Sequence, residues 1–271
     1  ISWTLRTVGF SSIISDIAYG GGFYLVTGGV PTAQASSTDA ISWTLRTSGF
    51  GTTIVNSIIF DGINTFVEAS SATNTLSTLS LSSRGLLSAS TDSINWSLRT
   101  FSNSTQQISV LSSTGSYVFA HGLDIWYEYS YISVSTDNIN WQLRTSPVNR
   151  NQFFSFASGG NTHVAVGSSG YILGSTDSTS WSIRTSGFGT SNINTVIYVN
   201  SVYVAGSNGG RIATSTDTIT WTTRTTSSSA GITQLIYDGL NYVVASGLSG
   251  TITVSTPQII SNLGTGALLR T

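Results

Sequence analysis

Short apolar runs, many of them alternating with polar residues, follow one another along the whole chain and are separated by turns of Gly, Asn, Ser, Thr and Asp. Residues 192–225 show the pattern in full, as the runs "NINTVIYV", "SVYVAGS", "GRIATST" and "TWTTRT". Runs rich in Val, Ile, Tyr and Thr between such turns favour β-strands. No segment repeats its apolar residues every 3.6 positions between helix caps, so helices are not expected. The pattern predicts an all-β protein.

A tryptophan returns at a nearly fixed interval, which indicates that the strands are organised in repeats. The successive intervals are 40, 53, 45, 40 and 40 residues along the series Trp3, Trp43, Trp96, Trp141, Trp181 and Trp221. A period of this length with four strands per unit is typical of a β-propeller blade. If the strands are called a to d from the axis outward, each tryptophan begins a strand d. Strands a, b and c are expected six times, at residues 13–37, 54–90, 106–135, 152–175, 193–215 and 232–255.

The two ends of this array complement each other. The last set of strands has Ser261 where the period would place a tryptophan, and the string around Trp3 stands before any strand a. We therefore expect residues 1–7 to supply strand d of the last blade, closing a ring of six four-stranded antiparallel blades without exposed sheet edges. The propeller would span residues 1–255, and residues 256–271 would be a tail or linker. The start within a repeat, without Met, suggests a processed product or a segment of a longer polypeptide.

The string around each tryptophan changes little: "STDAISWTLRT" at residues 37–47 returns as "STDSINWSLRT", "STDNINWQLRT", "STDSTSWSIRT" and "STDTITWTTRT". Its Asp follows strand c, so the carboxylate can accept backbone N–H bonds in the hairpin to strand d. Alternation along strand d puts the tryptophan and the residue two positions on in one face, and we expect both to pack between blades. The second residues of these pairs are Leu45, Leu98, Leu143 and Ile183.

This string resembles the Asp-box repeat of sialidase-like propellers, written loosely as Ser-x-Asp followed by Trp. The resemblance covers the whole chain, although the Gly usual after the Asp is missing from all five full copies and the last unit has Pro257 for the Asp. In that family the box is a fold signature outside the active site. The resemblance therefore implies a structural role for Asp39, Asp92, Asp137, Asp177 and Asp217.

Composition and charge exclude several kinds of function. Only 8% of the residues are charged and the formal net charge is -1, so the basic surface of a nucleic-acid-binding protein is missing. No apolar run approaches the roughly 20 residues that cross a bilayer. The chain has no Cys, Met or Lys, and its two histidines, His121 and His163, have no metal-like spacing. We expect no cofactor, no metal, no nucleic-acid partner and no membrane contact.

A secreted sialidase-like glycoside hydrolase is the enzymatic alternative that the resemblance raises. Such enzymes use three arginines, a Tyr activated by Glu, and an Asp acid. Six of the ten arginines instead occupy one equivalent position on the outer strands, and Glu68 and Glu128 are the only glutamates. A retaining carboxylate pair would need these residues or an Asp outside the boxes. The available aspartates are Asp16, Asp61, Asp124 and Asp238. We therefore expect a protein that is not an enzyme.

Two insertions between strands b and c break the repeat, and a scaffold can vary there without disturbing its core. One covers residues 70–85 and is rich in Ser and Thr, and the other is "HGLDIWYEYSY" at residues 121–131. The second mixes aromatic and acidic side chains, which suit the C–H faces and the hydroxyls of a sugar. Alternatively, one alternating set of these residues fills the blade interface. The candidate ligand-binding residues are Asp124, Trp126, Tyr127, Glu128 and Tyr129.

Three loops after strand d carry Gly-Phe, with Phe10, Phe50 and Phe188, and we expect these rings to plug the channel or to form a contact patch. The full pattern STD-x-I-x-W-x-x-R-T-x-GF is similar to repeats in tail or other virion-surface proteins of tailed phages. This resemblance implies a virion structural or host-recognition (adhesin-like) module, at the virion surface or extracellular. It would be displayed in an oligomeric assembly with other virion proteins, with a host surface glycan as candidate ligand. The alternatives are the hydrolase and a purely structural assembly propeller.

Overall fold

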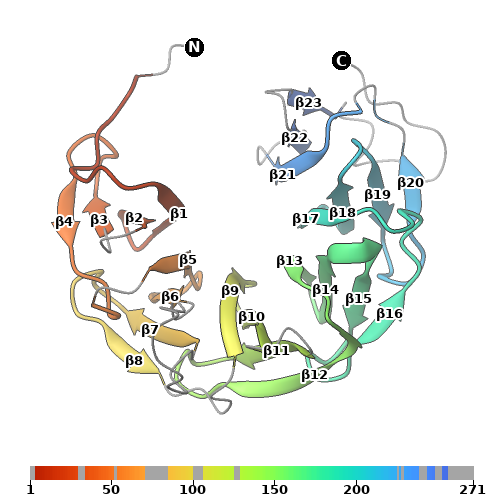
Figure 1. Cartoon of the computed structure of the whole chain (residues 1–271), viewed down its shortest axis with the longest axis horizontal. Helices are drawn as coiled ribbons and strands as arrows, with labels where there is room; N and C mark the ends of the chain where they lie inside the picture. Colours follow the sequence, from red (N-terminus) through yellow and green to blue (C-terminus); the bar gives the residue numbers. More distant parts are fainter. Residues whose placement is uncertain are drawn as a thin grey trace, which may run out of the picture. The chain divides into compact units, whose positions relative to one another are not determined.

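Almost all regular structure in the described part of the chain is β-strand, which confirms the all-β prediction (Figure 1). The computed structural model describes residues 4–29, 34–51, 54–70, 85–99, 106–124, 129–224, 226, 229–237, 243–247 and 252–255. Within these ranges the one helix is the 3₁₀ turn η1, Ser168–Gly170. The strands in these ranges form five four-stranded antiparallel sheets and one three-stranded sheet.

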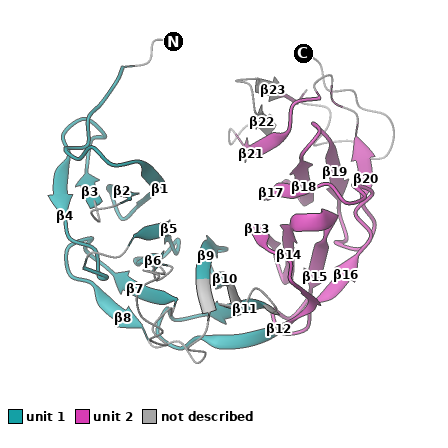
Figure 2. Cartoon of the chain, viewed as in Figure 1, with its two compact units in different colours: residues 1–144 teal, residues 145–271 magenta. Residues whose placement is uncertain are grey.

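The chain divides into two compact units, residues 1–144 and 145–271 (Figure 2). The first sheet of the first unit consists of β1 (Ile14–Gly20), β2 (Phe23–Gly28), β3 (Gln34–Ser37) and β4 (Thr44–Arg46). The second consists of β5 (Val55–Phe60), β6 (Phe66–Ser70), β7 (Leu86–Ser90) and β8 (Ser97–Arg99). The third consists of β9 (Gln106–Ser113), β10 (Val118–Asp124), β11 (Tyr129–Ser135) and β12 (Gln142–Asn149), and β12 continues past the boundary of the unit at residue 144.

The second unit repeats the arrangement. Its first complete sheet consists of β13 (Phe153–Gly159), β14 (Thr162–Gly167), β15 (Ile172–Ser175) and β16 (Ser182–Arg184). The next consists of β17 (Ile193–Val199), β18 (Val202–Ser207), β19 (Ile212–Ser215) and β20 (Thr222–Arg224). The three-stranded sheet consists of β21 (Ile232–Tyr237), β22 (Val243–Gly247) and β23 (Ile252–Val254). In every sheet the strands pair in chain order, as predicted for strands a to d.

In four of the sheets the first strand carries a bulge near its start, and the side chain after the bulge accepts a hydrogen bond from the following sheet of the same unit. Thr195 Oγ1, for example, accepts the N–H of Leu235 at 3.2 Å. The matching bonds run from Ile58 N to Asp16 Oδ2 (3.0 Å), from Leu111 N to Ser57 Oγ (3.3 Å) and from Val196 N to Ser155 Oγ (3.1 Å). Because a buried backbone N–H must find an acceptor, these bonds fix the register between neighbouring sheets.

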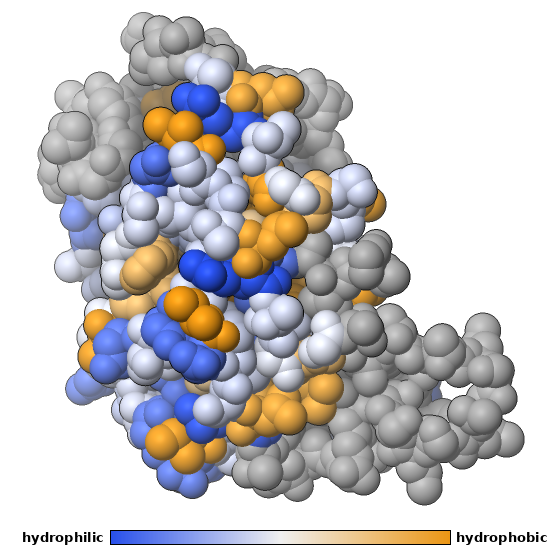
Figure 3. Space-filling model, turned by 90° about the vertical axis from the view of Figure 1, so that its left-hand side faces the viewer, coloured by the Kyte–Doolittle hydropathy of each residue, from blue (hydrophilic) through white to orange (hydrophobic). Residues whose placement is uncertain are grey.

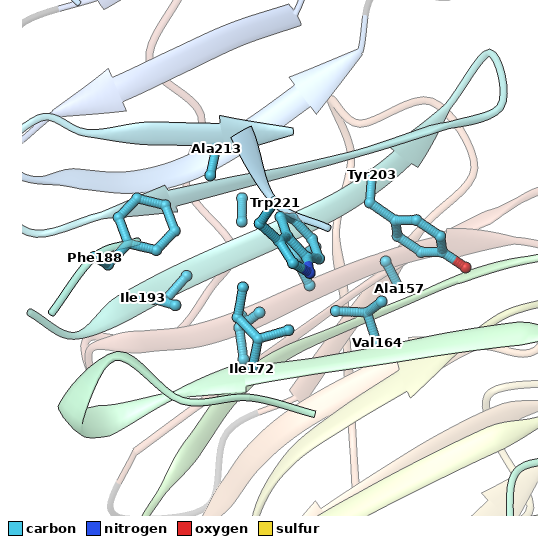
Figure 4. Packing of buried hydrophobic residues seen from close by; sticks show 11 residues of the cluster. Ala157, Val164, Ile172, Phe188, Ile193, Tyr203, Ala213 and Trp221 are labelled. Atoms are coloured by element: carbon cyan, nitrogen blue, oxygen red, sulfur yellow. The ribbon is translucent and has the colours of Figure 1, made fainter. Parts of the chain in front are cut away.

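Aliphatic and aromatic side chains fill the space between neighbouring sheets within a unit. In the second unit, Ile172 of β15 and Ala205 of β18 belong to one buried cluster with Trp221 (Figure 4). In the first unit, Leu87 of β7 and Ala120 of β10 belong to another. Removing these apolar faces from water is the main favourable contribution to folding. The core therefore lies between sheets, and each sheet needs a neighbour.

The predicted hydrogen bonds of the box aspartates are confirmed. Asp39 Oδ1 accepts the N–H groups of Ile41 and Ser42, both at 2.8 Å. The same two bonds form in the other four boxes at 2.7–2.9 Å. The residue after each Asp has a φ of 57° to 63°, in the order Ala40, Ser93, Asn138, Ser178 and Thr218. This is the position where the Asp-box resemblance has Gly, which adopts positive φ without a Cβ clash.

The prediction that the residue two positions after the tryptophan packs between blades is wrong for three of the four residues named, and the fourth, Leu143, is half-buried. Trp181 is 7% exposed, as expected for a core residue, but Leu45, Leu98 and Ile183 are exposed by 57%, 62% and 49%. The tryptophan stands before the strand, whereas the aliphatic residue lies at the middle of a three-residue outer strand. Alternation holds only for residues inside a strand, so it does not carry over from the tryptophan.

The expectation that the Gly-Phe loops place their rings as a plug or a contact patch is wrong for two of the three. Phe188 is fully buried, in the cluster that contains Ile172, and Phe50 is 8% exposed. Each phenylalanine N–H is bound by a serine two residues earlier, with distances of 3.3 Å from Phe50 to Ser48 Oγ and 3.1 Å from Phe188 to Ser186 Oγ. These turns direct the rings into the core. Phe10 is half-buried.

Ring closure by the N-terminal strand is not confirmed. Residues 4–7 form no strand, and the sheet of β21, β22 and β23 has no fourth strand among the described residues. The predicted tail, residues 256–271, lies outside the described residues.

Candidate functional site

The predicted glycan-binding residues are mostly outside the described part of the chain. Residues 125–128, which include Trp126, Tyr127 and Glu128, are not described, and neither are the side chains of Asp124 and Tyr129. Of the other insertion, residues 71–84 also lie outside. The sugar-contact site therefore stays a prediction that the structure does not test.

The remaining acids considered for catalysis, where described, accept hydrogen bonds from nearby backbone and side chains. Asp61 Oδ1 accepts the N–H groups of Ile63, Asn64 and Thr65 at 2.8–3.0 Å, and its Oδ2 accepts Asn138 Nδ2 at 2.8 Å. A shallow pocket beside Asp61 and Asn138 has room for about one water molecule. Asp16 binds Ile58 and Ser57 of the next sheet, and burial raises the pKa of its carboxyl.

The two histidines are buried strand residues. Burial lowers the pKa of His121 to about 3, and it also lowers the pKa of His163, whose Nδ1 lies 2.6 Å from Ser158 Oγ. Both imidazoles are therefore uncharged at neutral pH. No group of three or more His, Cys, Asp or Glu side chains capable of holding a metal occurs among the residues that were placed. Within the same residues no helix is long and apolar enough to span a membrane.

The residues that do stand out are large aliphatic side chains exposed on the box turns and outer strands. We call them the outer aliphatic surface. In the first unit it consists of Ile41, Leu45, Ile94, Leu98 and Ile139, and in the second unit of Ile183 and Ile219, with exposed fractions from 49% to 62%. Figure 3 faces the side on which β4 lies and shows hydrophobic side chains as separate patches among hydrophilic ones. Single exposed aliphatic residues are ordinary, but a position exposed in repeat after repeat is not.

The local geometry explains why the box isoleucines of this surface do not turn inward. The N–H of each box isoleucine is tied to the aspartate two residues before it, at 2.8–2.9 Å in Ile41, Ile94, Ile139 and Ile219. Backbone anchoring on one side and the positive φ of the preceding residue fix the turn. The outer strand that follows pairs with only one neighbour, so one of its edges keeps free backbone groups.

Each turn also presents a carboxylate that is ionised at neutral pH. The hydrogen bond from the N–H of Ser180, followed by that from Thr179, lowers the pKa of Asp177 to about 2. The N–H of Ser42 has the largest share in lowering the pKa of Asp39. On the outer strand the guanidinium of Arg46 donates from Nε to Ser36 Oγ at 2.9 Å. The surface therefore combines an anionic turn, exposed aliphatic groups and an arginine in each repeat.

Sequence reasoning missed the outer aliphatic surface, although the repeat contained a signal for it. The fifth copy has Thr223 at the position of Leu45, and the fourth has Thr179 at the position of Ile41. A position that holds Thr in one copy and Leu or Ile in the others is one where the side chain can be exposed to solvent. Both threonines are exposed in the structure.

No family model matches the chain, and no curated protein matches it. Solved structures do. YCF48 from Cyanidioschyzon merolae has 15% sequence identity and a TM-score of 0.66, covering 95% of this chain and 86% of that one. A structure of YCF48 bound to D1 peptide has 13% identity and a TM-score of 0.69 over 93% of this chain and 81% of that one. Virginiamycin B lyase from Staphylococcus aureus has 11% identity and a TM-score of 0.71, covering 92% and 86%.

These similarities correct the functional expectation. YCF48, a lyase and the WD40 β-propeller domain of Doa1 are not virion proteins, so the virion structural or host-recognition module is the wrong interpretation. The phage resemblance rested on a short repeat pattern, and that pattern reports how a blade is built. Identities of 11% to 15% carry no information on activity. What they show, together with the sheet topology, is that the chain has a β-propeller fold.

Proposed function

We propose that this chain is a non-enzymatic assembly propeller that binds other proteins through its outer aliphatic surface. The observation that carries the proposal is the repeated exposure of Leu45, Leu98 and Ile183 at the middle of outer strands. Aliphatic groups beside free strand-edge backbone groups are what a partner's extended segment can use. The structure of YCF48 with a D1 peptide is an example of a propeller bound to a segment of another protein.

The absence of an enzymatic role is part of this proposal. Of the described acids with raised pKa values, Glu68 is fully buried and Asp16 is half-buried, and both lie in contacts between sheets. A general acid or base must reach a substrate proton, and these carboxyl groups face protein donors. Their pKa shifts come first from burial, which structural positions also produce.

We further propose that the six sheets are six Asp-box blades spanning residues 1–255 and that residues 1–7 complete the last one. Exposure of the first sheet supports this. Ile17 of β1 is 56% exposed, although three of the residues at its register position in other sheets, Ile58, Val196 and Leu235, are at most 2% exposed. Those three pack against a preceding sheet. The face around Ile17 is therefore built to be covered by one.

Peptide binding tests the proposed function. The wild-type chain and the variant Leu45→Asp/Leu98→Asp are applied to an array of short extended peptides with alternating aliphatic residues. We expect the wild type to bind a subset and the variant to lose at least about tenfold in affinity for it. Ile63→Asp is the matched control, because Ile63 is 69% exposed but lies on the turn between β5 and β6. Equal loss in the control, or no binding by the wild type, would contradict the proposal.

A further inference from the structure

Two buried polar side chains face each other in the seam between the first and second sheets. Gln34 of β3 and Glu68 of β6 are both fully buried, and Gln34 Nε2 donates to Glu68 Oε2 at 2.9 Å. Glu68 Oε1 also accepts the N–H of Gly49 and the hydroxyl of Ser88, both at 2.7 Å. The carboxyl group thus joins β3, the connection between β4 and β5, and β7.

The strand registers show that these two residues depart from the repeat at both positions. Gln34 lies five residues before its box Asp, where the other sheets have Leu87, Ile132, Ile172, Ile212 and Ile252. Glu68 pairs with the residue four before its box Asp, where the others have Val26, Ala120, Ala165, Ala205 and Ala245. Every other sheet has an aliphatic residue at each position.

Elsewhere the same two positions make an apolar contact region. Leu87 and Ala120 share the buried cluster between the second and third sheets. Ile172 and Ala205 share the cluster between the two complete sheets of the second unit. The first seam has a polar pair in the place of Leu and Ala.

We propose that the Gln34–Glu68 pair is a recognition element. It makes the second sheet the only suitable neighbour for the face of the first sheet that carries Gln34. The other sheets carry aliphatic residues at both positions, so these positions do not distinguish one neighbour from another there. Gln34 packed against any other sheet would meet an alanine or valine and lose its carboxylate partner. Glu68 packed against any other sheet would meet Leu or Ile and stay buried without that donor. Both mismatches leave a desolvated polar group unpaired, which disfavours the wrong neighbour.

The pair is better suited to selecting the neighbouring sheet than to giving the fold the greatest stability. Gln34 Oε1 is buried without a hydrogen-bond partner among the described residues. An apolar pair at the same place would remove this unpaired acceptor, although Gly49 N–H and the Ser88 hydroxyl would then lose Glu68 as their acceptor. A polar group kept at such a site narrows the set of partners that fit, as single buried polar residues do in coiled coils.

Refolding of four proteins tests this inference: the wild type, Gln34→Ile, Glu68→Ala and the double variant, which restores the repeat residues. Each is unfolded in urea, refolded at high protein concentration and sized by light scattering after gel filtration. Each single variant should refold less efficiently, because the other partner is left unpaired. The double variant should fold stably but form exchanged oligomers at least about threefold more than the wild type.

Glu68→Gln is the conservative control. Its amide can still accept from Gly49 and Ser88 and can pair with Gln34, so its size distribution should match that of the wild type. A double variant with the wild-type distribution would overturn the proposal, because neighbour choice would then not depend on the pair. A double variant that does not fold would overturn it too, since repeat residues should fit this seam.

Discussion

The indole nitrogen of Trp221 donates a hydrogen bond to the carbonyl oxygen of Thr218, 3.2 Å away, across the turn that the box aspartate holds. Thr218 has a φ of 63°, a conformation that a β-branched residue rarely adopts. Thr218 is therefore strained, although its carbonyl group is needed as the acceptor for Trp221. The equivalent residue of every other box also has a positive φ. A glycine would keep the carbonyl and remove the Cβ clash.

Replacing Ser93 by Gly should stabilise the protein by about 1 kcal/mol. The substitution relieves a left-handed conformation at φ 59° and removes a buried hydroxyl that has no hydrogen-bond partner among the described residues. These gains exceed the added chain entropy of glycine in the unfolded state. Urea unfolding measures the effect. Ala89→Gly, inside β7, is the control and should destabilise, and a lower midpoint for Ser93→Gly would show that the turn is not strained.

Replacing Asp217 by Ala should lower the free energy of unfolding by about 1–2 kcal/mol, because two backbone N–H groups and the Ser215 hydroxyl lose their acceptor. Asp217→Asn keeps an acceptor oxygen at Oδ1 and should lose less. Chemical denaturation of both variants at neutral pH makes the comparison. Equal losses would mean that charge, and not the hydrogen bonds, stabilises the turn.

Stability should fall as pH rises through the titration of Glu68. Burial raises the pKa of its carboxyl from 4.5 to about 7, so the folded state binds this proton more tightly than the unfolded state. The contribution is fully present below pH 4.5 and is lost above about pH 7, at a cost of about 3 kcal/mol. Unfolding midpoints measured between pH 5 and pH 8 test this loss.

Glu68→Gln is the control for this pH dependence, since it cannot titrate. Burial also raises the pKa of Asp16, which contributes in the same direction from its ordinary value of 3.8 upward, so the difference between wild type and variant isolates Glu68. The box aspartates, whose pKa values are lowered, add stability that disappears only in more acidic solution. Parallel pH profiles of wild type and variant would mean that Glu68 does not change its charge in this range.

Leu45 and Leu25 allow a direct test of which leucines belong to the core. Leu25 is fully buried in β2 and Leu45 is 57% exposed in β4. Leu25→Ala should therefore cost about 2–5 kcal/mol, whereas Leu45→Ala should change stability by less than about 0.5 kcal/mol. Thermal unfolding of the two variants decides the matter. A large loss for Leu45→Ala would restore the sequence-based placement of this residue between blades.

The sequence predicted what depends on neighbouring residues and missed what depends on distant ones. The Asp39 turn could be predicted because its donors lie two and three residues away. The outward direction of Leu45 could not be read from Trp43, because the strand begins between them. The Gln34–Glu68 pair joins residues that are 34 positions apart, and no pattern among neighbouring residues predicts it. Once the repeats are aligned, however, two polar residues at apolar positions are visible in the sequence itself.

The exposed face of β1 provides the test of ring closure. If residues 1–7 complete the last blade and a sheet covers Ile17 in solution, Ile17→Ala should cost about 2–5 kcal/mol, as a buried isoleucine does. If the face stays open, the cost should be below about 1 kcal/mol. Ile58→Ala is the matched control, because Ile58 occupies the same register position and is 2% exposed. Deleting residues 1–7 should lower stability by a similar amount, since an exposed sheet edge replaces a paired one. Losses from Ile17→Ala and from the deletion that are both negligible would show that the N-terminal string does not close the ring.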